Sequence, residues 1–173
     1  MEILENKDEW TRTFQEGWFA HLKKTGHVDW RLYNHPRNRT SPAGPGISLR
    51  QSRIMLISSA GGYVDEVQEP FDAANPLGDY TYRLLPTEIA FDRIKYAHDH
   101  YDHTFVDEDP QVALPLTMLS RMVLQGKIGM MASSVISIMG YQPDSSMVVD
   151  ELAPHIVKIA KEHFVQAALL API

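Results

Sequence analysis

The chain has 173 residues, of which 44% are hydrophobic and 22% are charged, a composition typical of one soluble globular domain. The 16 Lys and Arg residues against 22 Asp and Glu residues give a net charge of -6, which argues against a protein that coats nucleic acid. Cysteine is absent, so this sequence holds no disulfide, no thiolate metal site and no cysteine nucleophile. No apolar run reaches the roughly 20 residues of a membrane helix and the N-terminus does not resemble a signal peptide, so we expect a cytoplasmic protein that has no membrane partner.

The first 26 residues are predicted to form an amphipathic helix, because large apolar side chains recur there at four-residue steps. Gly26 follows two lysines and is a suitable C-terminal stop. We expect the apolar stripe to pack on the rest of the domain, and a partner interface is the alternative. The side chains of the stripe are Trp10, Phe14, Trp18 and Leu22.

Residues 27–50 are rich in Pro, Gly, Asn and Arg and are predicted to form an irregular connector. Together with the helix they make a first region, 1–50, which precedes an α/β domain at 51–173. The arginines of the connector are expected in a solvated loop, with an anion-binding edge as the weaker alternative.

From residue 51 the pattern alternates between strands and helices, which predicts a three-layer α/β domain with a parallel, Rossmann-like sheet. A GxGxxG dinucleotide motif is absent. Residues 65–90 contain three prolines and are expected to form an excursion over the sheet edge. Asp144 is a candidate cap for the second helix, and Pro154 is expected to restart or kink that helix. The predicted strands are 54–58, 93–97, 128–139 and 164–173, the last one buried on both faces, and the predicted helices are 112–125 and 144–163.

A histidine-rich cluster, HDHYDH at 98–103, is the densest group of titratable residues. In one interpretation it is the HxHxDH motif of a metal-dependent hydrolase, with His98, His100, Asp102 and His103 as ligands of Zn or Fe. Only two further histidines follow downstream, which weakens that hypothesis. In the other interpretation no metal is bound and the imidazoles and carboxylates serve acid and base chemistry, or simply form a solvated loop.

Three further groups are candidates for substrate binding. Arg83 can hold a substrate carboxylate, although a structural pair with Asp79 is at least as plausible. Glycines after the first predicted strand, Gly61 and Gly62, and the turn Gly140-Tyr141 after a later strand let a ligand approach the backbone at the sheet edge.

Taken together, the ordered motifs resemble the family of glycine/sarcosine/betaine reductase component B and D-proline reductase, over about residues 50–173. The matching stretches are IMLISSAGGYV, EPFD, GDYTYRLLP, HDHYDH, DPQVALPLTML, IMGY, APHIVKIAKE and AALLAPI. Within them Asp79 and Arg83 match GDxxxR, the run from His98 to Asp102 matches HxHYD, and Ile138 replaces the Phe of an FMGY turn.

The resemblance implies a selenol- or thiol-dependent reductase that acts on a small amino acid or amine. It implies catalytic roles for His98, His100 and Asp102, the last orienting an imidazole, and substrate contacts for Asp79, Arg83, Tyr101, Gly61, Gly62, Gly140 and Tyr141. It also implies a pyruvoyl group on a partner subunit.

In relatives a selenocysteine or cysteine follows the segment that reads LLAPI here, so the resemblance places the redox residue immediately beyond Ile173. Either a selenocysteine codon was read as a stop, which we favour, or the chain is a short paralogue that binds a substrate or partner without catalysis. Both alternatives predict that the end of the last strand lies within a side chain's reach of His98 and Arg83. The aromatic helix and the last strand also invite homo-oligomer formation.

Overall fold

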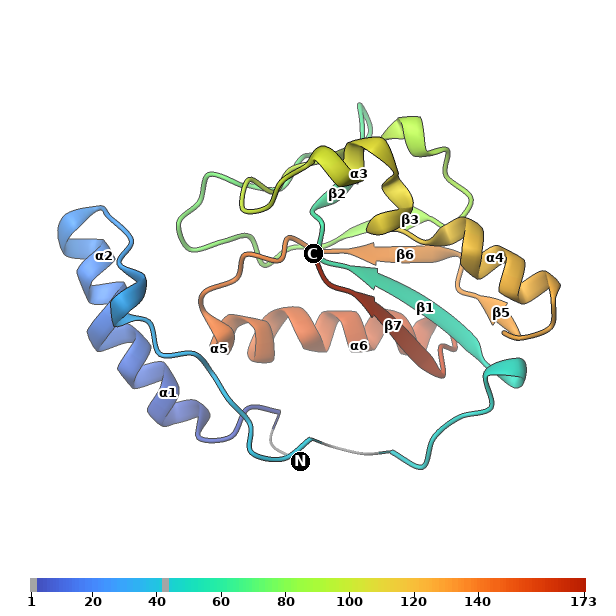
Figure 1. Cartoon of the computed structure of the whole chain (residues 1–173). Coiled ribbons are helices and arrows are strands. Elements are labelled where there is room, and N and C mark those ends of the chain that lie inside the picture. Colours follow the sequence, from blue (N-terminus) through green and yellow to red (C-terminus); the bar gives the residue numbers. More distant parts are fainter. Residues whose placement is uncertain (1–2, 42–43) are drawn as a thin grey trace.

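A mixed β-sheet forms the centre of the molecule (Figure 1). The computed structural model describes residues 3–41 and 44–173. Strand β1 (Arg53–Ser58) pairs in parallel with β5 (Met130–Met131), β6 (Ser134–Ser137) and β7 (Ala167–Ala171). Strand β3 (Arg83–Pro86) pairs antiparallel with β6. A separate antiparallel pair joins β2 (Gly62–Val64) to β4 (Ile94–Tyr96).

The α/β class predicted from the sequence is confirmed, but the sheet is mixed rather than purely parallel. The difference arises in the segment 65–90, expected to be an excursion, because its last part adds β3 to the edge of the sheet in antiparallel orientation. The predicted strand 93–97 pairs with β2 outside the main sheet, and the predicted strand 128–139 is divided into β5 and β6.

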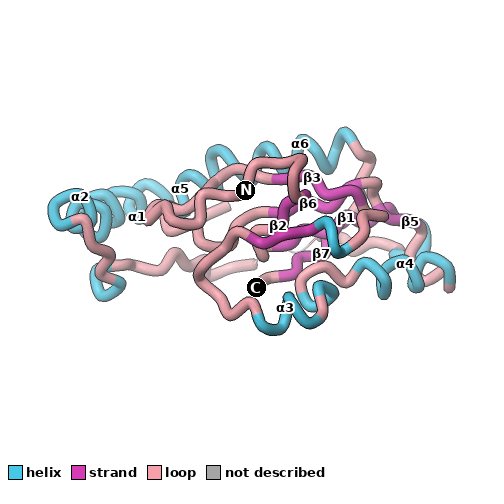
Figure 2. The backbone as a smooth tube through the Cα atoms, turned by 90° about the horizontal axis from the view of Figure 1, so that it is seen from above, coloured by secondary structure: helices cyan, strands magenta, loops and turns pink. Residues whose placement is uncertain are grey.

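Helices cover both faces of the sheet (Figure 2). On one face α6 (Ala153–Glu162) contributes Ile159 to a cluster with Met55 and Ile136. On the other face α3 (Thr104–Glu108) and α4 (Leu116–Leu124) pack over Leu56 and Val135. Because neighbouring residues of β1 point to opposite faces, this strand supplies both clusters, as the three-layer expectation requires.

The final strand, β7, lies at the edge of the sheet and is not buried on both faces as predicted. Its residues pair with β1 along their whole length, yet Leu169 is 41% exposed and Leu170 is 66% exposed. An apolar run indicates a strand in a sheet, but it does not determine how many neighbours that strand has.

A single run of helix begins at Asn6 and ends at Gly26, in three segments: α1 (Lys7–Phe14), the π-helical η1 (Gln15–Phe19) and α2 (Ala20–Thr25). Gly26 adopts a left-handed conformation with φ +71°, the C-terminal stop that its sequence predicts. The apolar stripe is buried against the chain's own Tyr33, Leu77 and Val149, so the prediction that it packs on the rest of the domain is confirmed.

The second long run of helix consists of α5 (Ser145–Met147), the π-helical η6 (Val148–Leu152) and α6. The carboxylate of Asp144 accepts a hydrogen bond from the Ser146 backbone N–H at 3.0 Å, as predicted for a cap. The π-helical turn immediately precedes Pro154, whose ring cannot be accommodated by an ideal α-helical turn. Short 3₁₀ turns occupy η2 (Trp30–Leu32), η3 (Leu49–Gln51), η4 (Phe91–Arg93) and η5 (Pro110–Val112). Among the described residues no helix is long and apolar enough to cross a membrane.

Candidate functional site

The segments that follow β1, β6 and β7 meet at one end of the sheet (Figure 1). The Gly61 N–H donates to the Ile138 carbonyl at 2.9 Å, and the Gly140 N–H donates to the Ser59 carbonyl at 2.9 Å. The hydroxyl of Ser59 accepts a hydrogen bond from the Ile173 N–H at 2.9 Å. Ser59 therefore joins the segment after β1 to both other strand ends, a role that the sequence analysis missed because a lone serine carries no distinguishing pattern.

His98 lies between two of these segments and is only 3% exposed. A Cβ on Gly61 would lie 2.9 Å from the His98 Cβ, and a Cβ on Gly140 would lie 3.2 Å from its Nε2. Both glycines are thus placed where a larger residue would press on the imidazole. The two glycine motifs and the histidine cluster, which are far apart in the sequence, thus lie together at this end of the sheet.

The imidazole of His98 is held as a neutral base. Burial lowers its pKa, and the neighbouring His100 and His103 lower it further against a small opposing effect of Asp99. The His100 backbone N–H donates to Nδ1 at 3.3 Å. Since Nδ1 accepts a hydrogen bond, we assign the ring proton to Nε2, on the side that faces Gly140.

Tyr101 and His100 complete the surroundings of His98. The ring of Tyr101 meets His98 edge-on at 5.1 Å, and its hydroxyl donates to the Ala60 carbonyl at 3.1 Å. The exposed imidazole of His100 lies flat on the ring of Tyr141, with 3.8 Å between centroids and an interplanar angle of 3°. His100 is therefore the more accessible of the two imidazoles.

Asp102 does not orient an imidazole in this structure. Its carboxylate accepts hydrogen bonds from the Thr104 N–H at 3.0 Å and the Thr104 hydroxyl at 2.7 Å, so it begins helix α3. Those hydrogen bonds lower the pKa of Asp102. His103 turns its Nε2 to the His98 carbonyl at 2.8 Å. Within residues 3–41 and 44–173 no three His, Cys, Asp or Glu side chains are grouped so as to hold a metal ion.

Asp79 and Arg83 hold the loop before β3 together. Asp79 accepts hydrogen bonds from the Asp72 and Thr81 backbone N–H groups. Burial opposes ionisation of Asp79, but the hydrogen bond from the Thr81 hydroxyl, these two backbone hydrogen bonds and the charge of Arg83 together outweigh burial and lower the pKa of Asp79. The Arg83 guanidinium stacks on Phe71. Four of its N–H groups donate to the carbonyls of Glu69, Pro70 and Tyr82 and to the hydroxyl of Thr81.

The last strand is linked to His98 only through shared neighbours, so its expected proximity to His98 stays a prediction, and its expected proximity to Arg83 is not met. Ile173 and Gly140 share Ser59 as a neighbour, and Gly140 contacts the imidazole. Arg83 begins β3, which lies at the opposite edge of the sheet from β7. A guanidinium with four of five N–H groups engaged is poorly placed to hold a substrate carboxylate.

Gly78 links the loop before β3 to the turn after β6. It has φ +80°, and a Cβ there would lie 2.2 Å from the Tyr141 carbonyl oxygen. The Tyr141 hydroxyl donates to the Pro76 carbonyl at 3.0 Å. The GDYTYR stretch therefore supports the site by fixing Tyr141.

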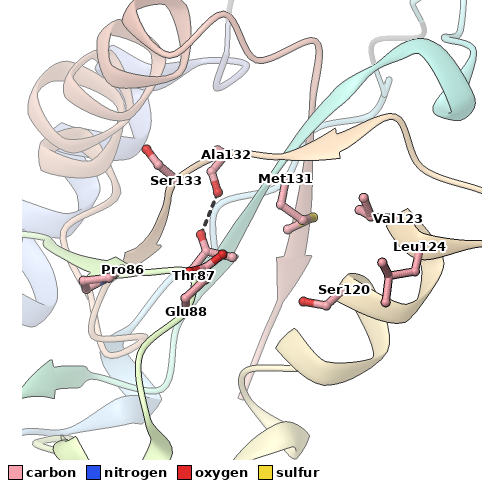
Figure 3. Close-up of a pocket in the computed structure, with 9 residues that line it drawn as sticks. All are labelled: Pro86, Thr87, Glu88, Ser120, Val123, Leu124, Met131, Ala132 and Ser133. Atoms are coloured by element: carbon pink, nitrogen blue, oxygen red, sulfur yellow. Dashed lines mark hydrogen bonds between the residues drawn. The ribbon is translucent and has the colours of Figure 1, made fainter. Parts of the chain in front are cut away.

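A pocket of about 630 Å³ lies elsewhere, between α4 and the end of β3 (Figure 3). The Thr87 hydroxyl donates to the Ala132 carbonyl at 2.6 Å in its wall. The lining residues are Pro86, Thr87, Glu88, Ser120, Val123, Leu124, Met131, Ala132 and Ser133. They include none of the residues around His98, so this pocket is separate from the candidate site.

Comparison with known proteins places the chain in a family. The model of the family "Glycine/sarcosine/betaine reductase selenoprotein B" matches residues 32–172. The D-proline reductase subunit gamma of Acetoanaerobium sticklandii is 26% identical over 122 residues, which are 70% of this chain and 49% of that protein. The chain thus spans about half the length of this curated relative, and no solved structure gives a significant match. The chain belongs to the glycine/sarcosine/betaine reductase selenoprotein B family.

Proposed function

We propose that this chain provides the proton-donating and substrate-binding part of a selenol- or thiol-dependent reductase that releases an amine from a small amino acid or amine. The observation that carries the proposal is the position of His98, a buried imidazole whose Nε2 lies next to Gly140, while Gly140 and the strand end at Ile173 share Ser59 as a neighbour. Family membership supports the reductase class.

The redox residue in this proposal is a selenocysteine or cysteine carried by the segment that follows β7. It would supply the nucleophile for cleavage of the carbon–nitrogen bond. A site for it next to Ser59 fits the residues present, since Gly140 places no side chain of its own between Ser59 and the Nε2 of His98.

His98 would act as the general acid. The acid is the imidazolium form of the ring, whose Nε2–H lies on the side of Gly140 and is the proton available to a leaving amine, whereas the neutral ring can only donate a hydrogen bond there. Because the pKa of His98 is lowered, its imidazolium form is scarce near neutral pH but gives up its proton readily. A negative charge next to the ring would favour formation of the imidazolium.

His100 and Tyr141 form the accessible wall on which the substrate would lie. Aromatic faces attract ammonium groups, and an imidazole stacked on a phenol ring offers both a π surface and a proton-exchanging edge. Burial raises the pKa of Tyr141, which keeps its hydroxyl protonated and bound to Pro76. A partner subunit that carries a pyruvoyl group would activate the amine of the substrate.

The test is substitution of His98 in the complete reductase with a dithiol as electron donor. The measurement is released ammonia or amine, or, for D-proline, the primary amine that ring opening creates on the product. His98→Gln should lower turnover by about 10²- to 10⁴-fold, the usual contribution of general acid catalysis. His163→Gln is the matched control, because His163 contacts Ser133 and Arg53 at the other end of β1. Undiminished turnover of His98→Gln with glycine, sarcosine, betaine and D-proline would refute the proposal.

A further inference from the structure

Trp30 connects the N-terminal helix to the candidate site. It lies in η2, just outside the segment 32–172 that the family model matches, and it is 50% exposed. Its indole meets the ring of Tyr141 edge-on, with 5.9 Å between centroids and an interplanar angle of 87°. The same Tyr141 ring carries His100 on its face.

From this arrangement we infer that Trp30 is a positioning residue, which fixes the imidazole of His100 by holding the ring of Tyr141. The effect of Trp30 on catalysis rests on the proposed function, whereas the contacts by which it positions His100 do not. It assigns a role in the site to the N-terminal region, which the sequence analysis treated as a packing element.

Trp30 is itself anchored on two sides. Its ring packs against Trp18 at 5.4 Å and Tyr33 at 5.3 Å, and Trp18 is buried in the N-terminal helix. The Asp29 carboxylate begins the 3₁₀ turn by accepting the Arg31 N–H at 3.0 Å and binds the Arg31 guanidinium at 2.7 Å. The indole is therefore packed against the N-terminal helix and also contacts the ring of Tyr141.

Apart from the stacked His100 ring itself, the contacts described so far restrain Tyr141 at its two ends. The hydroxyl is bound to the Pro76 carbonyl, and the backbone carbonyl lies against Gly78. These contacts leave the ring free to turn about the axis that joins them. An edge-on indole restricts that rotation and so defines the plane on which His100 lies.

The test compares Trp30→Leu with Trp30→Phe and with Leu32→Ala, a half-exposed apolar residue in the same 3₁₀ turn. The readout is the NMR signal of the His100 ring protons in chain labelled at histidine, because stacking on Tyr141 displaces those signals. Tyr141→Leu supplies the signal position without stacking. We expect Trp30→Leu to move the His100 signals toward that position, and Trp30→Phe and Leu32→Ala to leave them near the wild-type position.

Unchanged His100 signals in folded Trp30→Leu would overturn the inference, whatever the chain catalyses. If Trp30→Leu does not fold, unchanged signals in Trp30→Ala or displaced signals in Leu32→Ala would overturn it equally. In the complete reductase we expect Trp30→Leu to lower kcat/KM about tenfold, since small displacements of a positioned group cost rate. If Trp30→Leu displaces the His100 signals while Trp30→Leu and His100→Ala both keep wild-type turnover, Trp30 positions His100, but His100 has no part in the proposed function.

Discussion

At the scale of single residues, the site depends on glycines, which leave room where other parts of the chain approach the backbone closely. Gly61 and Gly140 flank His98, and Gly78 admits the backbone of Tyr141. At Gly61 and Gly78 a Cβ would collide with a backbone carbonyl, and at Gly140 it would press on the imidazole and on Ser59. In each of the motifs AGG, GDY and MGY a glycine therefore lies in close contact with His98 or with Tyr141.

Gly61→Ala should destabilise the fold by about 2–4 kcal/mol, because a residue with a Cβ is strained at the positive φ of this position and the added carbon would collide with a backbone atom. That Cβ would lie 2.7 Å from the Ala97 carbonyl oxygen. Gly126→Ala is the control, since Gly126 has φ +64° with no atom within 4 Å of the added carbon, and it should cost only about 1 kcal/mol of strain. Urea denaturation measures both, and equal losses would contradict the role given to Gly61.

The free energy of unfolding should decrease as the pH is lowered, and part of this decrease should depend on His98. The folded pKa lies below the ordinary value of 6.5, so the unfolded state binds a proton first. Stability contributed by neutral His98 is then complete above 6.5 and is lost as pH falls from 6.5 through the lower folded pKa.

Urea denaturation at pH 7.5 and at several values down to pH 5 measures this loss. His98→Gln cannot be protonated and should show a shallower decline than wild type. An identical decline in the two proteins would show that His98 titrates alike in the folded and unfolded states.

At the scale of elements, β7 departs most from its expected surroundings. It carries no charged residue, pairs with β1 on one side and exposes Leu169 and Leu170. Natural edge strands usually carry a charge, a proline or a covering element that prevents further pairing. Within β7 itself no residue of that kind occurs.

Leu170→Lys should therefore reduce concentration-dependent association of this chain, as sedimentation velocity can measure, while changing the free energy of unfolding little. Leu124→Lys is the matched control, because Leu124 is 88% exposed on α4, away from the β7 edge. Equal association of wild type and Leu170→Lys would show that the β7 edge does not promote self-association.

At the scale of the whole molecule, ring contacts run from the N-terminal helix to the histidine cluster. Trp18 contacts Trp30, Trp30 contacts Tyr141, and Tyr141 carries His100. The helix is further tied to the rest of the chain by the Tyr33 hydroxyl, which donates to the Pro143 carbonyl at 2.8 Å. The two regions divided at residue 50 in the sequence analysis thus share one set of packed rings.

Phe14→Ala should lower the free energy of unfolding by about 3–5 kcal/mol, because it empties a packed position in this set. Phe105→Ala, at a 66% exposed position on α3, should change it far less. If the regions unfold together, circular dichroism and tryptophan fluorescence will report one transition in wild type and in Phe14→Ala. A separate early fluorescence transition would contradict the shared packing.

Much of the fold could be predicted from local patterns. The apolar stripe ending at Gly26, the strand beginning near Ile54 and the cap at Asp144 all depend on residues close together in the sequence. Their spacing alone determines which face is apolar and where the backbone must turn. The meeting of the segments that carry Gly61 and Gly140 was also predictable, because parallel strand ends gather at one edge of a sheet. The position of His98 beside them was not, because it follows β4, which lies outside that sheet.

The partners of polar side chains were settled only by the tertiary structure. Arg83 and Asp102 had the right chemistry for a substrate clamp and an imidazole orienter, yet nearby carbonyls engage the first and Thr104 engages the second. The sequence by itself determined the periodicity and the turns, since these follow from the spacing of residues along the chain. Only the tertiary structure decided the edge position of β7 and the link from Trp30 to Tyr141, because both depend on which distant surfaces come into contact.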